Sequence, residues 1–448
     1  MKKTISLLLC ACVFMGLVGC NAAPTGFTTP ATPSLAPVAT TSAPAEESTE
    51  VTPLNENITF WYCYTDKVQE NNENLTAEFN ETVGKELGIT VTAEYQGDYA
   101  TMSQKLKAAY VSGTAPAVTV LDTSMLRPYA ASGILQTLDT YIDRDADEVN
   151  IADFQPAFMT DSAYDGQIYS LPYLRSTPIL YLNTTILEQA GLDTTGPATW
   201  DDLALYAETI KEKTGKYGMT IFAYAWIFQA FMMEQESSIY NADMTATNIN
   251  SDAAKEIINL INELRDNGSV RVLASSQSGT MLADVTSQNC GMWYYSAGGL
   301  TTFMALADAN EFGMTTAFLP KGMVSACPTG GANLVMTSKL TDNQQEAAWQ
   351  FIKWMTAKEQ TIAASTTTGY LPSRLSAVED ATMQTLYASV PQFKTIVDQL
   401  EYAGGVTSSA SEADAAIVNA LDSIWVNGAD VDTTLAELEI KVNAILNQ

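Results

Sequence analysis

Strand-like and helix-like segments alternate along most of the chain, and this order restricts the fold more than any other feature of the sequence. A β-rich run at residues 58–64 is followed by a helix whose apolar residues recur every four positions until Gly88. A strand at 89–95, a helix at 99–111 and a buried strand at 117–121 complete the first set. This β-α-β-α-β order predicts parallel strands joined by helical crossovers, and therefore an α/β fold.

A second set of elements begins near Gln167 and continues to the end of the sequence. Thr199 and Asp202 are spaced as a capping box, which predicts a helix running to Lys213. Residues 56–448 exceed the size at which a single hydrophobic core stops growing, so we expect two lobes. The other expected elements are strands at 168–171, 178–182, 291–295 and 333–337 and helices at 252–266, 346–355, 412–426 and 433–446.

The first twenty residues have the layout of a secretory signal. Lys2 and Lys3 precede an apolar stretch from Ile5 to Val18, which at about 14 residues is shorter than the roughly 20 that a membrane span needs. We therefore expect residues 1–19 to be cleaved as a signal peptide. The tetrapeptide that ends at Cys20 resembles the lipobox of bacterial lipoproteins. This resemblance implies that Cys20 is lipidated and holds the chain on the extracellular face of the cell membrane, and the alternative is an ordinary signal with an incidental cysteine.

Residues 20–55 have the composition of a stalk. The segment is rich in proline, threonine and alanine and contains no lysine or arginine. Such a composition buries too little apolar surface to offset the entropy lost on ordering. We therefore expect an extended tether between Cys20 and the folded part, with the lipid as its only attachment to the membrane.

Charge and composition exclude several classes of function. The net charge of −29 disfavours binding to nucleic acid and steers anionic ligands away. The chain has no histidine, so neither a Ser-His nor a Cys-His nucleophile can form, and the commonest zinc ligand is missing. Cys63, Cys290 and Cys327 lie beyond Cys20 and allow at most one disulfide. We expect no metal and no cofactor.

Several short stretches in a fixed order carry a resemblance to a known family. Among them are Ser112-Gly-Thr-Ala-Pro116, Gly166-Gln-Ile-Tyr-Ser-Leu-Pro172, Ser176-Thr-Pro-Ile-Leu-Tyr-Leu-Asn183, Gly330-Gly-Ala-Asn333 and Thr368-Gly-Tyr-Leu-Pro372. Across almost the whole mature chain this order resembles the extracellular solute-binding proteins, family 1, of carbohydrate ABC importers.

This resemblance implies the periplasmic-binding-protein type II fold, in which each lobe is a mostly parallel sheet flanked by helices and a hinge joins the lobes. It implies a first lobe of residues 56–165 plus 315–370 and a second of 166–314 plus 371–448. It also implies a monomer that catalyses no reaction and delivers a carbohydrate to the permease subunits of an ABC importer.

Within this family the layout is most similar to that of the glycerol 3-phosphate binding proteins. The similarity implies a stacking role for Trp226 and places the other ligand contacts at Tyr99, Asp122 or Thr123, Ser176, Ser296, Gly331 and Tyr370. The chain departs from those proteins because no Arg or Lys occurs between Lys394 and Lys441, where they place a base on the phosphate. A buried phosphate without a charged partner loses several kcal/mol, which favours a neutral sugar. A phosphate-bearing ligand is the alternative, in which case Arg175 or Lys321 would turn toward the cleft.

Aromatic residues at the ends of predicted strands support the sugar interpretation independently. Sugar rings present apolar faces to flat side chains and hydroxyl groups to amides and carboxylates. We expect at least one ring among Trp61, Trp226 and Trp293 to stack on the ligand, and Tyr62 is a further candidate. Core packing is the alternative role for each ring. Two other functions remain open, a surface glycosidase and a structural or adhesive lipoprotein, although acid pairs such as Asp201-Asp202 are explained by a helix cap.

Overall fold

The computed structural model describes residues 53–241, 243–405 and 411–447. The unit that contains the described residues spans 51–448. The expectations for the signal peptide, for Cys20 and for all but the last residues of the stalk lie outside the described residues. Within the described part of the chain, no helix is both long enough and apolar enough to cross a membrane.

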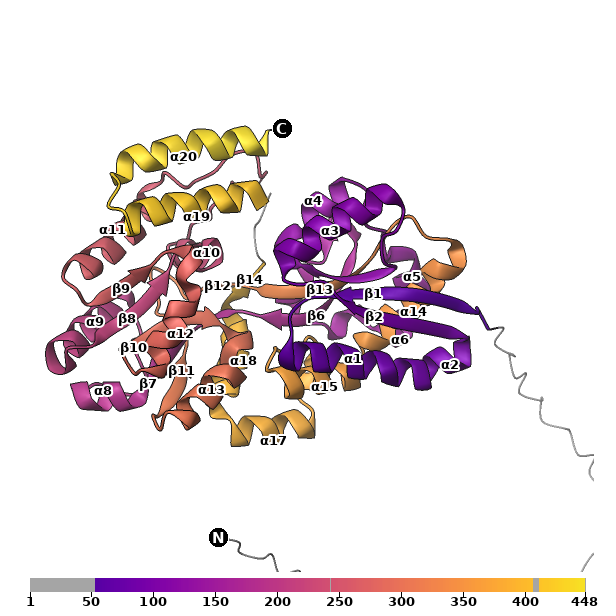
Figure 1. The fold of residues 1–448 in the computed structure, drawn as a ribbon, viewed down its shortest axis with the longest axis horizontal. Coiled ribbons are helices and arrows are strands. Elements are labelled where there is room, and N and C mark those ends of the chain that lie inside the picture. Colours follow the sequence, from indigo (N-terminus) through magenta and orange to yellow (C-terminus); the bar gives the residue numbers. More distant parts are fainter. Residues whose placement is uncertain (1–52, 242, 406–410, 448) are drawn as a thin grey trace, which may run out of the picture. The chain divides into compact units, whose positions relative to one another are not determined.

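The first lobe is built on a five-stranded sheet with the strand order β2-β1-β3-β13-β6 (Figure 1). Strand β1 pairs in parallel with β2 and β3, whereas β13 runs antiparallel to both β3 and β6. Four strands therefore point one way and β13 points the other way. The strands are β1 (Glu56–Tyr62), β2 (Ile89–Tyr95), β3 (Val118–Asp122), β6 (Ser170–Ser176) and β13 (Gly330–Met336).

The second lobe repeats this plan with the order β11-β7-β10-β8-β9. Strand β10 pairs in parallel with β8, and β8 pairs in parallel with β9, whereas β7 runs antiparallel to β10 and β11. Both sheets are thus mixed, with the reversed strand second from one edge in each. The strands are β7 (Pro178–Asn183), β8 (Tyr217–Phe222), β9 (Val270–Leu273), β10 (Cys290–Ser296) and β11 (Met314–Ala317).

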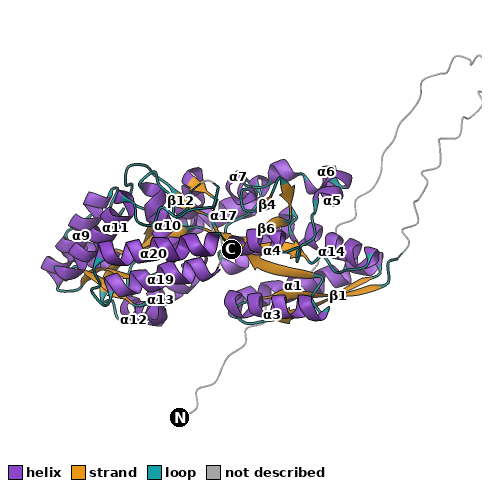
Figure 2. Cartoon of the chain, turned by 90° about the horizontal axis from the view of Figure 1, so that it is seen from above, coloured by secondary structure: helices purple, strands orange, loops and turns teal. Residues whose placement is uncertain are grey.

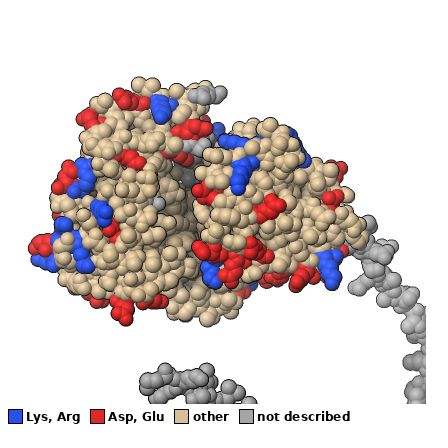
Figure 3. All heavy atoms as spheres, viewed as in Figure 1, with Lys and Arg blue, Asp and Glu red and all other residues tan. Residues whose placement is uncertain are grey.

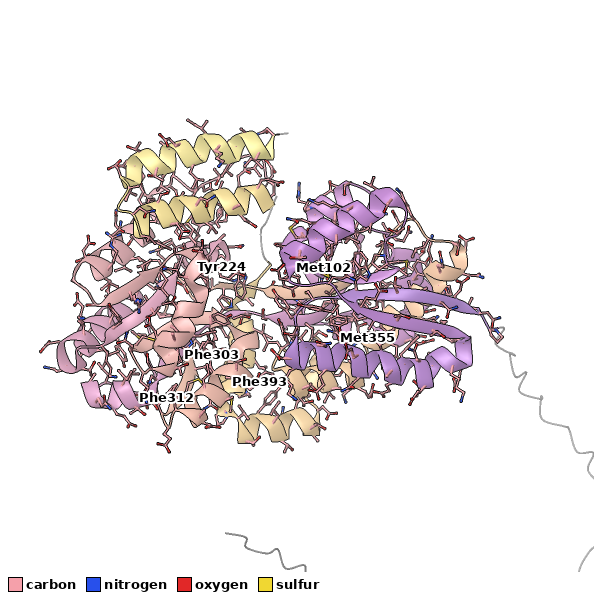
Figure 4. The ribbon with its side chains drawn as sticks, viewed as in Figure 1. Met102, Tyr224, Phe303, Phe312, Met355 and Phe393 are labelled. Carbon is pink, nitrogen blue, oxygen red and sulfur yellow. The ribbon has the colours of Figure 1, made fainter. Side chains whose placement is uncertain are left out.

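Helices cover both sheets, which confirms the predicted two-lobed α/β fold (Figure 2). Separate apolar clusters fill the faces of each sheet, and Figure 4 labels Met102 and Met355 from the first lobe and Phe303, Phe312 and Phe393 from the second. The first lobe carries α1 (Asp66–Glu81), α2 (Val83–Leu87), α3 (Tyr99–Ser112), α4 (Leu126–Ala131), α5 (Asp139–Arg144), α6 (Ala146–Val149), α7 (Pro156–Met159), α14 (Asp342–Met355) and α15 (Lys358–Thr368). The second lobe carries α8 (Thr184–Ala190), α9 (Trp200–Thr214), α10 (Ala225–Glu234), α11 (Asp252–Asp266), α12 (Ser278–Thr286), α13 (Leu300–Ala309), α17 (Ala381–Ser389), α18 (Pro391–Asp398), α19 (Ser411–Trp425) and α20 (Val431–Leu446), and α16 (Leu375–Val378) lies at the junction.

The predicted capping box at the start of α9 is present. The Thr199 hydroxyl accepts a hydrogen bond from the amide of Asp202, and the Asp202 carboxylate accepts one from the amide of Thr199 at 3.1 Å. Both groups satisfy amides that the first helical turn leaves free. The cap accounts for Asp202, and Asp201 lies in the first turn of the helix, where a negative charge is favourable.

The chain passes between the lobes at places that differ from the expected boundaries. Strand β6 belongs to the first sheet and β11 to the second, so residues 166–176 and 315–317 change lobes relative to the sequence-based assignment. The expected boundary is displaced because β6 continues almost directly into β7. The chain therefore crosses between the lobes at Thr177, after β6, and not before β6 as expected. The second crossing lies between β11 and β13, and the third lies near Leu371.

Candidate ligand-binding cleft

A cavity of about 1010 Å³ lies between the two lobes. Figure 3 shows a hollow on the corresponding face, on which acidic atoms outnumber basic ones. A volume at the upper end of the usual 300–1,000 Å³ range for ligand sites is large enough for a ligand of more than one ring. Both lobes and the crossing segments line the cavity, with Tyr64, Asp98, Tyr99, Asp122, Thr123, Ser124, Gly330 and Gly331 from the first lobe and Phe222, Tyr224, Trp226, Tyr295, Ser296, Phe303 and Asp414 from the second.

The first-lobe wall forms where β1 and β3 end. Tyr64 follows β1, and its ring meets the edge of Tyr99, the first residue of α3, with 4.9 Å between the ring centroids. Asp122 ends β3, and its Oδ1 accepts hydrogen bonds from the amide and the hydroxyl of Ser124 at 2.9 and 2.6 Å. Burial raises the pKa of Asp122, although these hydrogen bonds and Arg175 act in the opposite direction. This wall thus offers two rings and a carboxylate.

The second-lobe wall is an aromatic row between β8 and α10. Phe222 and Tyr224 stack with their centroids 5.8 Å apart, and Tyr224 lies 5.9 Å from Trp226. The Trp226 Nε1 donates a hydrogen bond to the Thr329 carbonyl at 2.9 Å, and a Cβ added at Gly330 would lie 2.5 Å from the Trp226 ring. Trp226 therefore rests on the chain that enters β13. Tyr224 is 43% exposed, and Figure 4 shows it near the space between the lobes.

The crossing segments supply the floor. Ser176 at the end of β6 is buried, and Tyr370 follows α15 just before the third crossing. Gly331 has a φ of +88°, and a Cβ there would lie 2.1 Å from the Leu174 carbonyl oxygen. Only glycine fits this position, because a side chain would separate β13 from β6.

Neither of the two basic residues expected to turn toward a phosphate-bearing ligand lines the cavity. Arg175 is fully buried and pairs with Asp161 at 2.7 Å, and Lys321 lies outside the lining. Among the described residues, no Lys or Arg lines the cavity, whereas Asp98, Asp122 and Asp414 do. The cleft therefore offers aromatic faces and hydrogen-bond acceptors but no positively charged side chain from the described part of the chain.

Three sequence-based candidates pack in or against the core clusters and do not line the cavity. The Trp61 indole packs between core clusters and donates to Glu94 at 2.8 Å, and Tyr62 is 1% exposed with its hydroxyl donating to Glu73. Trp293 is 0% exposed and stacks on Tyr181 with an interplanar angle of 6°. All three lie within strands whose two faces are both covered, so their rings turn to the core. The other candidates line the cavity, and their contact with a ligand remains a prediction: Tyr99, Asp122, Thr123, Ser176, Trp226, Ser296, Gly331 and Tyr370.

Several lining residues were missed as candidates. Tyr224 and Asp98 each directly precede a helix that follows a strand. Tyr64 belongs to the aromatic residues at the ends of predicted strands, although it was not singled out as a contact, and in the structure Cys63 separates it from the end of β1 at Tyr62. Their signal in the sequence is this position at the carboxyl end of a strand, where open sheets bind ligands. Asp414 comes from α19, far along the chain, and no local pattern indicated it.

Comparison with known proteins identifies the family. Residues 74–395 match the family model of the bacterial extracellular solute-binding proteins. The chain belongs to this family. Its members are binding proteins, and this chain is a solute-binding protein of an ABC importer.

Individual relatives are distant but cover most of the chain. The sn-glycerol-3-phosphate-binding periplasmic protein UgpB of Brucella melitensis is 26% identical over 355 residues, which are 77% of this chain and 80% of the relative. The structure of UgpB from Mycobacterium tuberculosis in complex with glycerophosphocholine matches with a TM-score of 0.77 and 26% identity, over 88% of this chain and 98% of that chain. The cyclic alpha-maltosyl-1,6-maltose binding protein of Arthrobacter globiformis matches with a TM-score of 0.76 over 88% and 99% of the two chains, and its 22% identity supports the fold alone.

Proposed function

We propose that this solute-binding protein captures a neutral saccharide between its lobes and delivers it to the permease subunits of its importer. The observation that carries the proposal is the composition of the cleft. Aromatic rings from both lobes face a cavity that also contains carboxylates and hydroxyls, and none of its described lining residues is Lys or Arg. Such a lining suits the apolar faces and the hydroxyl edges of sugar rings.

The distribution of these groups over both lobes supports a clamp mechanism. Tyr64, Tyr99 and Asp122 belong to the first lobe, and Tyr224 and Trp226 belong to the second. A ligand stabilises the closed form only if it contacts both lobes more fully in that form than in the open one. A saccharide held between the two aromatic walls meets this condition, and closure of the lobes is a hinge motion.

We propose no catalytic role for the carboxylates of the cleft. Asp98 accepts a hydrogen bond from the Thr101 amide at 2.7 Å as the N-cap of α3, and Asp122 caps the turn at Ser124 in the same way. These local bonds account for both side chains. A glycosidase would need a proton-donating acid and a second carboxylate on opposite sides of one glycosidic bond.

A thermal-shift screen tests the proposal. A ligand that binds only the folded state stabilises it by about 2.7 kcal/mol at 100 times its Kd. We expect a rise in the unfolding temperature with at least one neutral mono- or oligosaccharide and none with glycerol 3-phosphate. A rise with glycerol 3-phosphate and with no saccharide would overturn the sugar assignment.

Glycerophosphodiesters are the second candidate, because the structure of UgpB from Mycobacterium tuberculosis contains glycerophosphocholine. Aromatic faces beside carboxylates also suit a quaternary ammonium group. The phosphate is the difficulty, because the described lining offers it no cation. Stabilisation by glycerophosphocholine, but by neither glycerol 3-phosphate nor choline alone, would favour this candidate over the saccharide.

We also propose that Cys20 is lipidated after removal of residues 1–19, so that a monomer is tethered to the extracellular face of the cell membrane by residues 20–55. The signal-like N-terminus and the Leu17-to-Cys20 tetrapeptide support this proposal. A Cys20→Ser variant should leave the membrane fraction and appear in the medium, since stable anchoring requires acyl chains. If the variant still pelleted with membranes after a high-salt wash, the lipid anchor would be excluded.

A further inference from the structure

Arg175 is a fully buried cation at the end of β6, and its guanidinium is saturated with hydrogen bonds. The Asp161 carboxylate accepts one of these bonds at 2.7 Å, and the Arg175 guanidinium lies 4.7 Å from the centroid of the Phe158 ring. The other acceptors are the Gly330 carbonyl at 2.9 Å, the Phe158 carbonyl at 3.0 Å, the Asn333 Oδ1 at 2.8 Å and the Thr329 hydroxyl at 3.0 Å. Because an arginine has five N–H groups, no donor is left over for a solute.

All three crossings between the lobes meet at this residue. The first crossing lies at Thr177, with Ser176 between it and Arg175. The second crossing ends at Thr329 and Gly330, which both accept hydrogen bonds from the Arg175 guanidinium. In the third crossing, the amide of Leu371 donates to the Arg175 carbonyl at 2.8 Å. Figure 1 shows β6 and β13 running side by side where the lobes join.

The same network reaches the cleft through Thr329. Its hydroxyl donates to Asp161, and its amide donates to the Gly404 carbonyl at 2.7 Å. Its carbonyl accepts the Trp226 Nε1 hydrogen bond, and the neighbouring Gly330 lies directly beneath the Trp226 ring. Trp226 belongs to the second lobe and Arg175 to the first, so Thr329 links a lining ring to the crossing segments of the chain.

We propose that Arg175 is a positioning residue for solute capture, which holds the three crossings in register and fixes the segment Thr329–Gly331 that supports Trp226. A buried ion pair contributes little net stability, because desolvation offsets most of the attraction. Its physical contribution here is a fixed geometry, since directional bonds from one guanidinium to two stretches of chain, 158–161 and 329–333, define one arrangement. The proposal goes beyond the choice of saccharide and holds for any solute that the cleft binds.

Hydrogen exchange of the solute-free protein, followed by mass spectrometry, tests this role. Thr329→Val removes the hydroxyl that joins Arg175 to Asp161. Thr337→Val is the matched control, because Thr337 is equally buried and its hydroxyl also makes a short bond, to the Pro116 carbonyl at 2.7 Å. We expect Thr329→Val to accelerate exchange in all three crossings, including the distant one at 370–374, and Thr337→Val to leave those crossings unchanged. Thr329→Ser should restore the wild-type exchange.

The opposite results would overturn the proposal. Acceleration confined to residues adjoining 329, or an equal acceleration at 370–374 in Thr337→Val, would show an ordinary buried hydrogen bond. Should Thr329→Val not fold, the wild-type protein decides the question. The amides of Thr329 and Leu371 should then be protected as strongly as those in the centre of β10, and exchange as fast as in exposed loops would contradict a fixed crossing.

Discussion

Replacement of Arg175 by methionine should be among the most destabilising single changes in this protein. The guanidinium is 0% exposed, and the side chain of Asp161 is 3% exposed. Removal of the cation leaves a buried carboxylate without its charged partner and leaves the carbonyls of Phe158 and Gly330 without this donor. Breaking a buried pair in this way costs about 3–5 kcal/mol of unfolding free energy.

A double-mutant cycle separates the charge effect from the loss of packing. In Arg175→Met/Asp161→Asn the uncompensated charge is gone, so the double variant should be more stable than the sum of the single losses predicts, with a coupling of roughly 0.5–3 kcal/mol. Urea unfolding followed by circular dichroism measures all four proteins. Arg144→Met is the surface control, because Arg144 is 47% exposed in its ion pairs and such pairs contribute about 0–1 kcal/mol.

Two results would refute this reasoning. One is a loss in Arg175→Met no larger than that in Arg144→Met, which would mean that leaving the buried Asp161 carboxylate without its charged partner costs no more than breaking a surface pair. The other is strict additivity in the cycle, which would mean that Arg175 and Asp161 act independently despite their 2.7 Å contact.

Three further predictions concern the cleft, the Asp145 carboxylate and the buried thiols. Trp226→Ala should weaken binding of the solute identified in the screen by about 1–3 kcal/mol by calorimetry, whereas Trp293→Ala should lower the unfolding free energy by about 3–5 kcal/mol; equal effects of both on binding would contradict the assignment of Trp293 to the core. Hydrogen bonds from Arg144, Trp349 and Lys353 lower the pKa of Asp145, so the stabilisation that Asp145 provides is present above its unfolded pKa of about 3.9 and is lost as the pH falls toward the folded pKa. Asp145→Asn should therefore make the free energy of unfolding depend less on pH in the acid range. An unchanged pH dependence in that range would show that the ionised Asp145 carboxylate does not stabilise the fold. Burial raises the pKa of the three described thiols, which belong to Cys63, Cys290 (to about 12) and Cys327. A thiol reagent at neutral pH should therefore modify them only after denaturation. Fast labelling of the native protein would contradict their burial.

The sequence alone predicted the features that depend on local or compositional rules. Alternating strands and helices specified the α/β class, and the length required two lobes. The spacing of Thr199 and Asp202 predicted a cap, because both bonds lie within one helical turn. The sequence also showed directly that the stretch between Lys394 and Lys441 contains no Lys or Arg, so this stretch has no basic side chain to offer a phosphate.

Only the tertiary structure decided which aromatic rings reach the cleft. Strands β1 and β10 are covered by other elements on both faces. The alternation of side chains along such a strand therefore shows which of two apolar clusters a side chain enters, but it does not show which side chains reach the cavity. Trp293 therefore packs inside the core and Trp61 packs against its edge, whereas Tyr64 and Tyr224, just past strand ends, line the cleft.

The role of Arg175 also depends on tertiary contacts. Its neighbour Ser176 lines the cavity, so the sequence could not exclude that Arg175 faces a ligand. Its five N–H groups are taken by residues 158, 161, 329, 330 and 333, most of them more than 150 positions away along the chain. No local pattern specifies partners that are so distant in sequence, because they come together only when three segments of chain cross between two folded lobes.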